Sequence, residues 1–122
     1  MKKDTYEALL DTVRSPIVFV DNDHIIRFLN KPAKERYYGK QGYSDLIGKS
    51  LFDCHNKESE KLTKTIHDRL IAGEDEVFLK LSDDNYRITV VAVRDHSRNL
   101  IGYYERFEQI TELLNSAGPR DR

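Results

Sequence analysis

The sequence predicts an α+β domain in which a five-stranded antiparallel sheet is covered on one face by helices. Segments rich in β-branched and aromatic residues, which favour strands, form two groups, one towards each end of the chain. Segments with helical periodicity are bunched between them. A doubly wound sheet needs strands and helices in alternation, so this order excludes it. At 122 residues the chain is long enough for one hydrophobic core but not for two.

The two most distinct strands lie near the C-terminus. Residues 86–94 read Tyr-Arg-Ile-Thr-Val-Val-Ala-Val-Arg, and residues 100–110 have a similar composition. The intervening residues 95–99 are turn formers and predict a hairpin loop. A third strand is predicted at residues 76–81, joined to the hairpin by a turn at 82–85. Both long strands exceed the usual length of about 5–6 residues, so they predict a broad platform that the rest of the chain covers.

Two shorter strands are predicted before the helices, at residues 17–20 and 24–29, with an acidic turn between them. Asn30 can then cap a short helix at residues 31–38 that stops at the following glycine. A single helical turn is expected at residues 44–48. These short elements connect the first strands to the longest helix.

The longest helix is predicted at residues 57–72, capped by Asn56 and ended by Gly73. Its apolar positions form a narrow stripe that suits packing across a sheet. The stripe consists of Ser59, Leu62, Ile66 and Leu70, with Thr63 and Ile71 to one side.

A further amphipathic helix is predicted at the N-terminus, over residues 5–13. Tyr6, Leu9, Leu10 and Val13 have helical spacing there. The stripe can pack on its own domain or on a second copy, and we favour the second copy because so short a helix is marginal without tertiary contacts. The expected organisation follows in three parts: a dimerisation helix or linker at 1–15, the main domain at 16–111, and the start of a C-terminal helix with a linker tail at 112–122.

The composition excludes several classes of function. A net charge of −1, with 34% charged and 39% hydrophobic residues, offers no electrostatic footprint for nucleic acid. No apolar run approaches the length of a membrane span. A lone cysteine excludes an internal disulfide and favours a cytoplasmic setting. No glycine-rich phosphate loop or assignable catalytic triad is present, so we do not expect an enzyme.

Several short motifs occur in an order that is more specific than any one of them. They are residues 17–21 turning into 25–30, the Leu46-Ile47-Gly48-Lys49-Ser50 turn, Gly73 after the long helix, Gly102 early in the last strand, and the closing Gln109-Ile110-Thr111. With these motifs the chain resembles a PAS domain over about residues 6–111. The elements Leu51-Phe52-Asp53-Cys54-His55 and Ala92-Val93-Arg94-Asp95, with Glu105, are similar to a PAS subgroup of bacterial sensor and regulatory proteins.

The resemblance implies a pocket between the sheet and the helices for a small ligand. It also implies a sensory or dimerisation role, with an effector or kinase domain as a possible partner. The expected ligand-binding residues are Cys54, His55, Ile66, Leu70, Tyr86, Ile88, Val90, Tyr103 and Glu105. Tyr37 and Tyr43 are among the tyrosines that could offer hydroxyl groups.

Glu105 is the polar misfit on an otherwise apolar strand face that carries Ile101, Tyr103 and Phe107. If Glu105 points inward, it needs a partner such as His55 or Arg94, or its pKa must rise. If this face is the outer one, the carboxylate is simply exposed. The sequence leaves both orientations open.

The identity of a cofactor stays open. Flavin-type PAS photosensors place their reactive cysteine three residues after the glycine of the 46–50 turn, where Leu51 stands here, so a flavin photoadduct is not expected. Haem-binding PAS domains carry a histidine on the long helix, which makes His67 a haem candidate, with His55 as a second. His67 lies at the border of the apolar stripe, however, and a solvated histidine is favoured there. Cys54 and His55 alone do not make a metal site.

Three functional hypotheses therefore remain. The first is a sensor that binds a small molecule and acts as a homodimer. The second is a haem-based redox or gas sensor. The third is a ligand-free structural dimerisation module.

Overall fold

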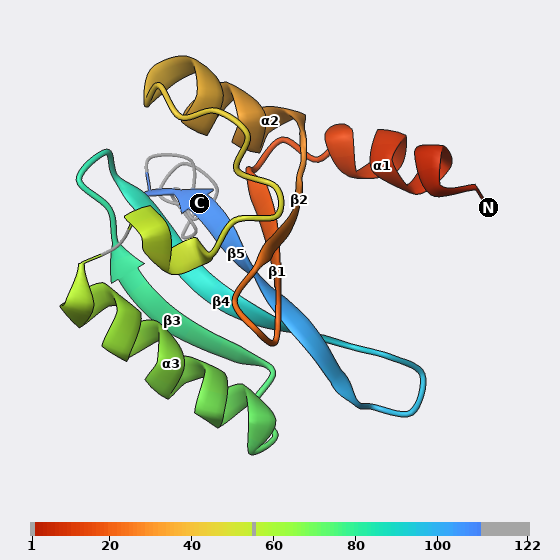
Figure 1. The fold of residues 1–122 in the computed structure, drawn as a ribbon, viewed down its shortest axis with the longest axis vertical. Coiled ribbons are helices and arrows are strands. Elements are labelled where there is room, and N and C mark those ends of the chain that lie inside the picture. The colour runs from red at the N-terminus through yellow and green to blue at the C-terminus, as the bar shows by residue number, and fades with distance from the viewer. Residues whose placement is uncertain (1, 55, 111–122) are drawn as a thin grey trace, which may run out of the picture.

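The computed structural model describes residues 2–54 and 56–110 (Figure 1). Five antiparallel strands form one sheet in the order β2-β1-β5-β4-β3, which confirms the predicted α+β class. The strands are β1 (Ile17–Asp21), β2 (Ile26–Leu29), β3 (Glu76–Leu81), β4 (Tyr86–Arg94) and β5 (Leu100–Gln109).

The helices lie in the middle of the chain except for the first one. They are α1 (Lys3–Asp11), α2 (Lys31–Lys34), the π-helix η1 (Glu35–Lys40), the 3-10 helix η2 (Leu51–Cys54) and α3 (Lys57–Ile71). In Figure 1, α3 runs alongside β3, and α1 projects away from the sheet. Among the described residues, no helix is both long enough and apolar enough to cross a membrane.

The core lies between the sheet and the covering helices. Its largest fully buried side chains come mainly from the sheet: Tyr103, Phe107, Leu29, Leu70, Val20, Val90 and Asn30. In the strand register, Tyr103 pairs with Val20 on β1 and with Ala92 on β4. Since residues paired across antiparallel strands point to the same face, Tyr103 lies on the same inner face as Val20 and Ala92, and the sequence left this orientation of β5 open.

Gly102 marks the closest approach between β5 and β1. A Cβ atom at this position would lie 2.3 Å from the backbone oxygen of Val20 and 2.9 Å from the ring of Phe19. Both distances are below van der Waals contact, so any side chain here would push the two strands apart.

The orientation of α3 differs from the predicted one. Ile66 and Leu70 are buried as expected, but Leu62 is 43% exposed and Ile71 is 60% exposed. The buried face consists of Thr63, Ile66, His67 and Leu70. The helix is rotated because His67, counted as polar in the sequence pattern, finds hydrogen-bonding and ring contacts inside the fold that make its burial acceptable.

The prediction of a short helix at residues 31–38 is also wrong in detail. The α-helical part covers only Lys31–Lys34, and the chain continues as a π-helix from Glu35 to Lys40, past the glycine expected to stop it. Residues 44–48, expected as one helical turn, contain no helix. Single π-turns of this kind are frequent at functional sites, where they change the direction of side chains.

Asn30 has a larger role than the predicted helix cap. Its Oδ1 accepts hydrogen bonds from the amides of Ala33, at 3.1 Å, and Ile17, at 2.8 Å. Its Nδ2 donates to the carbonyl oxygens of Leu10 and Ser15, both at 3.1 Å. One fully buried amide therefore joins α1, β1 and α2.

Candidate functional site

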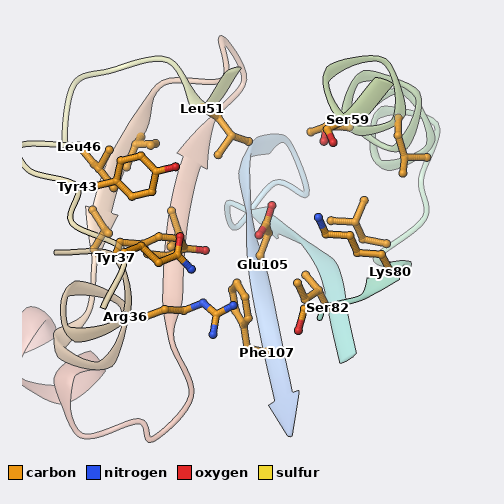
Figure 2. A pocket seen from close by; sticks show the side chains of 18 of the residues that line it. Arg36, Tyr37, Tyr43, Leu46, Leu51, Ser59, Lys80, Ser82, Glu105 and Phe107 are labelled. Carbon is orange, nitrogen blue, oxygen red and sulfur yellow. The ribbon is translucent and has the colours of Figure 1, made fainter. Parts of the chain in front are cut away.

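A cavity of about 310 Å³ lies between the inner face of the sheet and the helical segments (Figure 2). This volume is at the small end of the range for ligand pockets, about 300–1,000 Å³. The lining residues come from both layers: Val18, Ile26, Leu29, Arg36, Tyr37, Gln41, Tyr43, Leu46, Leu51, Asn56, Ser59, Leu62, Thr63, Leu79, Lys80, Ser82, Ile88, Glu105 and Phe107. About half of them carry polar groups, which is unusual for space inside a small core.

Glu105 lies at the sheet side of the cavity and is only 9% exposed. It pairs with Val18 on β1 and with Val90 on β4, so its side chain stands on the inner face between two buried valines. The structure thus settles the orientation that the sequence left open. A carboxylate in this position is costly to bury and needs donors around it.

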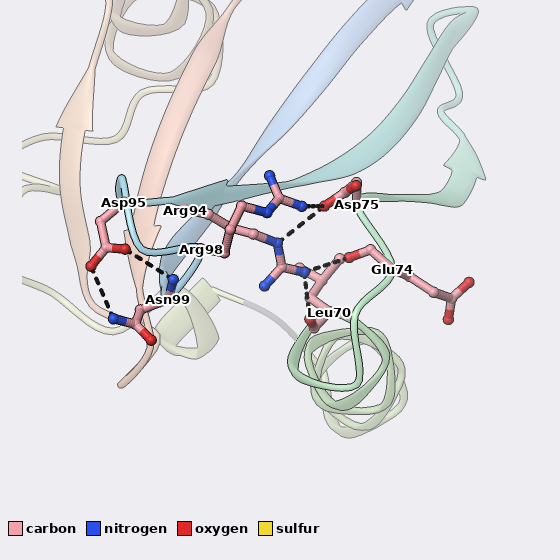
Figure 3. Close-up of polar contacts among 7 residues, drawn as sticks. All are labelled: Leu70, Glu74, Asp75, Arg94, Asp95, Arg98 and Asn99. Carbon is pink, nitrogen blue, oxygen red and sulfur yellow. Dashed lines mark hydrogen bonds and ion pairs between the residues drawn. The ribbon is translucent and has the colours of Figure 1, made fainter.

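Arg94, one of the two partners predicted for Glu105, is engaged elsewhere (Figure 3). Its Nε donates to Asp75 Oδ1 at 3.0 Å. Its Nη2 donates to the carbonyl oxygens of Leu70, at 2.7 Å, and Glu74, at 2.9 Å. Arg94 therefore caps the C-terminal end of α3 and ties it to β4. The other predicted partner, His55, lies outside the described residues.

Arg36 closes one side of the cavity. Its guanidinium donates to both carboxylate oxygens of Asp84, at 2.7 and 3.3 Å, and joins the π-helix to the turn between β3 and β4. The guanidinium also lies 5.1 Å from the ring centroid of Tyr86 and 5.0 Å from that of Phe107. The hydrogen bond from Arg36 is the main reason why the pKa of Asp84 is lowered to about 2.

Lys80 reaches the cavity through an irregularity in β3. Phe78 pairs with Thr89 and Lys80 pairs with Ile88, so Leu79 is an extra residue in the ladder. This bulge places both Leu79 and Lys80 at the cavity and leaves Leu81 60% exposed. Within the described part of the chain, the Lys80 side chain makes no hydrogen bond or ion pair.

The predicted site residues fall into three groups. Ile88 and Glu105 line the cavity, together with the tyrosines Tyr37 and Tyr43. A second group is buried or part-buried nearby without lining it: Ile66, Leu70, Tyr86, Val90 and Tyr103. The third, the side chain of Cys54 and the whole of His55, lies outside the described part of the chain.

Sequence reasoning missed the cationic residues Arg36 and Lys80, and the polar start of α3 at Asn56, Ser59 and Thr63. The start of α3 could have been found, because Asn56 was recognised as its cap and its Oδ1 accepts from the amide of Ser59 at 2.8 Å. The two cations depend on a π-helix and a bulge, which alternation alone does not reveal.

His67 was predicted to be solvated and is instead 8% exposed, at the opposite end of α3 from Asn56. Its Nε2 lies 3.0 Å from Asn22 Oδ1, and its ring centroid is 4.8 Å from that of His24. His24 Nδ1 lies 2.7 Å from the hydroxyl of Tyr103. Burial lowers the pKa of both histidines, and in His24 the neighbouring His67 and Lys64 lower it further.

The positions of His24 and His67 do not fit a haem site, and His55, the second haem candidate, lies outside the described residues. In the described residues, no histidine is among those that line the cavity, and His67 is held against Asn22 and His24. Nor do the described residues contain a group of three or more His, Cys, Asp or Glu side chains suited to a metal ion. The imidazoles instead fill space in the core.

Comparison with known proteins agrees with this architecture. The sequence model of a family described as PAS domain matches residues 6–111. A C-terminal domain from Streptococcus mutans is similar in fold, with a TM-score of 0.77 and 19% identity over 95% of this chain and 90% of that one. Among proteins with curated descriptions, none matches the chain.

Two further structures share the fold. A PAS domain of a protein from Colwellia psychrerythraea has a TM-score of 0.64 and 18% identity, covering 89% of this chain and 97% of that one. A sensory box sensor histidine kinase from Vibrio cholerae has a TM-score of 0.59 and 18% identity, covering 88% and 90%. At these identities the likeness is one of fold.

Proposed function

The chain belongs to the PAS domain family, and we propose that it is a sensory module that binds a small molecule and signals as a homodimer. The similar fold of a sensor histidine kinase supports the signalling role and makes an effector or kinase domain a plausible partner. We further propose that the module is not an enzyme, because its candidate residues suit binding and not bond breaking. The single cysteine of the sequence suits the reducing cytoplasm, where we expect the module to act.

The observation that carries ligand binding is the cavity between the sheet and the helical segments, with Glu105 buried on its wall. A purely structural core of this size is normally filled with apolar side chains. Here the space is bordered by a carboxylate, a lysine and several hydroxyls. A lining of this mixed character suits a small polar molecule.

Native mass spectrometry of the purified chain tests this function. We expect a co-purified molecule that is released on denaturation. Ser59→Phe should reduce the bound fraction, because the new ring occupies the cavity. Thr65→Phe, on the exposed face of the same helix, is the matched control and should leave it unchanged. An apo mass for the parent chain, with no gain on incubation with metabolite extract, would favour the ligand-free dimerisation module instead.

The proposed dimer uses α1. No residue of this helix is buried. The exposed fraction is 51% for Tyr6 and 58% for Leu9, which lie on the helix, and 40% for Val13, which follows it. Such a stripe suits a second copy of itself, which would remove apolar area from water. Deletion of residues 1–13 should convert a dimer to a monomer in sedimentation. Leu9→Glu should do the same without removing the contacts of Asn30, and Glu7→Gln, a change on the same helix that adds no charge to the apolar stripe, should not.

Signalling requires that the ligand bind two states unequally. The start of α3 borders the cavity, and its end is tied to β4 through Arg94. A ligand that shifts α3 would therefore also displace the end of β4, where the β4–β5 hairpin begins. The output would leave through α1 or through residues 111–116, which lie outside the described residues.

A further inference from the structure

We propose that the domain also responds to protons, through two histidines, His24 and His67, that pack against each other next to the cavity. This inference goes beyond the proposed ligand and adds a second input to the module. The histidines come from different elements, because His24 lies between β1 and β2 and His67 lies on α3. Their ring centroids are 4.8 Å apart, and the rings meet edge to face at 72°.

Hydrogen bonding fixes the neutral form of His67. The Nδ2 of Asn22 donates to the carbonyl oxygen of Leu100 at 2.8 Å, so Oδ1 is the amide atom that faces His67. This oxygen only accepts, and Nε2 of His67, 3.0 Å away, therefore carries the proton. A proton gained from solvent must go to Nδ1, and it makes the ring cationic at a site where it is only 8% exposed.

Hydrogen bonding also fixes the neutral form of His24. Its Nδ1 lies 2.7 Å from the hydroxyl of the fully buried Tyr103. Among the described residues, this hydroxyl forms no other hydrogen bond, and burial raises its pKa, so it stays protonated and donates to Nδ1. A proton added to Nδ1 turns that nitrogen into a donor and leaves the hydroxyl hydrogen without an acceptor. Protonation of His24 therefore disrupts the contact with β5.

Charged groups from three elements surround the pair and its partner Tyr103. They are Asp21 and Asp23 at the β1–β2 turn, Lys64 and Asp68 on α3, and Glu105 on β5. From η2, the ring of Phe52 packs against His24 at a centroid distance of 4.8 Å. Burial outweighs the nearby carboxylates and lowers the pKa of both histidines, and the second imidazole and Lys64 lower that of His24 further. The first proton therefore disfavours the second.

The pair is connected to the cavity through three elements. The amide of Leu51, a lining residue, donates to the carbonyl oxygen of His24 at 2.7 Å. Thr63, also a lining residue, lies one helical turn before His67. Glu105 follows Tyr103 by two residues and shares its face of β5. A movement of α3 away from the β1–β2 turn on protonation would therefore change the wall of the cavity.

Nuclear magnetic resonance of the full chain between about pH 8 and pH 5, which brackets the unperturbed histidine pKa of about 6.5, tests the proposal. The imidazole signals of His24 and His67 should titrate below that value. The backbone amide signals of Leu51 and Thr63 should shift with the same midpoints, because the two residues are joined to the histidines. His96→Gln, in the exposed β4–β5 loop, is the control and should leave all these midpoints unchanged.

Asn22→Asp is the sharpest variant, because Asn22 is exposed and the change is nearly isosteric. A carboxylate beside Nε2 of His67 stabilises the imidazolium and should raise the midpoint of His67 by about 1–3 pH units. The amide of Thr63 should follow it. Asn56→Asp adds the same charge at the other end of α3, retains the helix cap, and should leave the midpoint unchanged.

Tyr103→Phe tests the second contact. The neutral form of His24 loses one hydrogen bond, so its midpoint should rise by about 0.5–1 pH unit. Thermal unfolding at neutral pH checks that each variant folds. If Tyr103→Phe does not fold, Asn22→Asp decides the proposal alone.

The inference is overturned if the imidazoles titrate at or above about 6.5, if the amides of Leu51 and Thr63 do not shift with them, or if Asn22→Asp leaves His67 and Thr63 unchanged. None of these outcomes removes ligand binding or the dimer. Those proposals fall separately, by native mass spectrometry and by sedimentation.

Discussion

The two ends of α3 meet the sheet in different ways. At the closed end, His67 and Leu70 pack with His24 and Tyr103, and rings and aliphatic groups fill the space. At the open end, where the helix begins, the same two layers enclose the cavity. Within one small interface the chain therefore separates the packing that supplies stability from the space that suits a ligand.

This difference shows how a small core can hold a polar cavity. The closed end, with Leu70 fully buried and Arg94 capping the last turn, fixes the helix on the sheet. The open end can then place polar side chains such as Lys80 and Glu105 beside the cavity. If this separation holds, substitutions at the closed end should change the stability of the domain, and those at the open end should mainly change binding.

Leu70→Ala should have the largest effect on stability, lowering the free energy of unfolding by about 2–5 kcal/mol, because it leaves a hole in a fully buried site. Urea denaturation measures this. Leu62→Ala, in the same helix but 43% exposed at the open end, should cost less than about 1 kcal/mol. Equal losses for the two leucines would refute the comparison.

Gly102→Ala should come next, with a loss of about 1–3 kcal/mol from overpacking against Val20 and Phe19. The same denaturation experiment measures it. A Cβ at Gly39, in the π-helix, would meet no atom within 4 Å, so Gly39→Ala is the control and should be nearly neutral. A neutral Gly102→Ala would mean that the two strands can separate at little cost.

Acid should loosen the closed end by a smaller amount. The pKa values of His24 and His67 are lowered in the folded state, so below the unfolded value of 6.5 the unfolded chain binds more protons. Their contribution to stability is complete above pH 6.5 and is lost as pH falls from there towards the folded-state pKa values. Nearby Asp21 and Asp68 oppose the shifts.

Chemical denaturation between pH 7.5 and 5.5, a window of about one pH unit on each side of the unfolded pKa, measures this loss. His67→Gln should flatten the profile, and His96→Gln, in the exposed β4–β5 loop, should not. A profile that stays steep in the His67 variant would assign the acid sensitivity to other groups.

Asp84→Asn should have the smallest effect, about 0.2–1 kcal/mol, because the side chain of Asp84 is 54% exposed and its pair with Arg36 is screened by water. The stabilisation from the lowered pKa of Asp84 is present above pH 3.8 and is lost as pH falls towards about 2. Urea denaturation at pH 7 measures the loss, with Glu60→Gln as the control for an ordinary surface pair. A loss above about 2 kcal/mol would make the open end a major source of stability.

The sequence predicted the framework well because its patterns are strong there. The strand at Tyr86–Arg94 and that at Glu76–Leu81 have the predicted bounds, and Asn30 and Asn56 cap the helices that they were expected to cap. Alternation along β5 correctly placed Tyr103, Glu105 and Phe107 on one face, but it did not decide which face of the sheet that was.

The site was harder to predict, because its residues depart from those patterns. His67 counts as polar in a hydrophobicity pattern, yet its ring is accommodated by Asn22 and His24, which are distant in sequence. Lys80 enters the cavity only because of a bulge in strand pairing, which alternation does not encode. Glu105 could be oriented only once its neighbours Val18 and Val90 were known.

Asn30 gives the N-terminal helix a mechanical role. Its side-chain amide forms hydrogen bonds with the end of α1, with the first turn of α2 and with the backbone of β1. In the proposed dimer, a tilt of the sheet edge would move α1 with it, and the two α1 helices in contact would move together. Asn30→Ala should remove this connection between α1, β1 and α2.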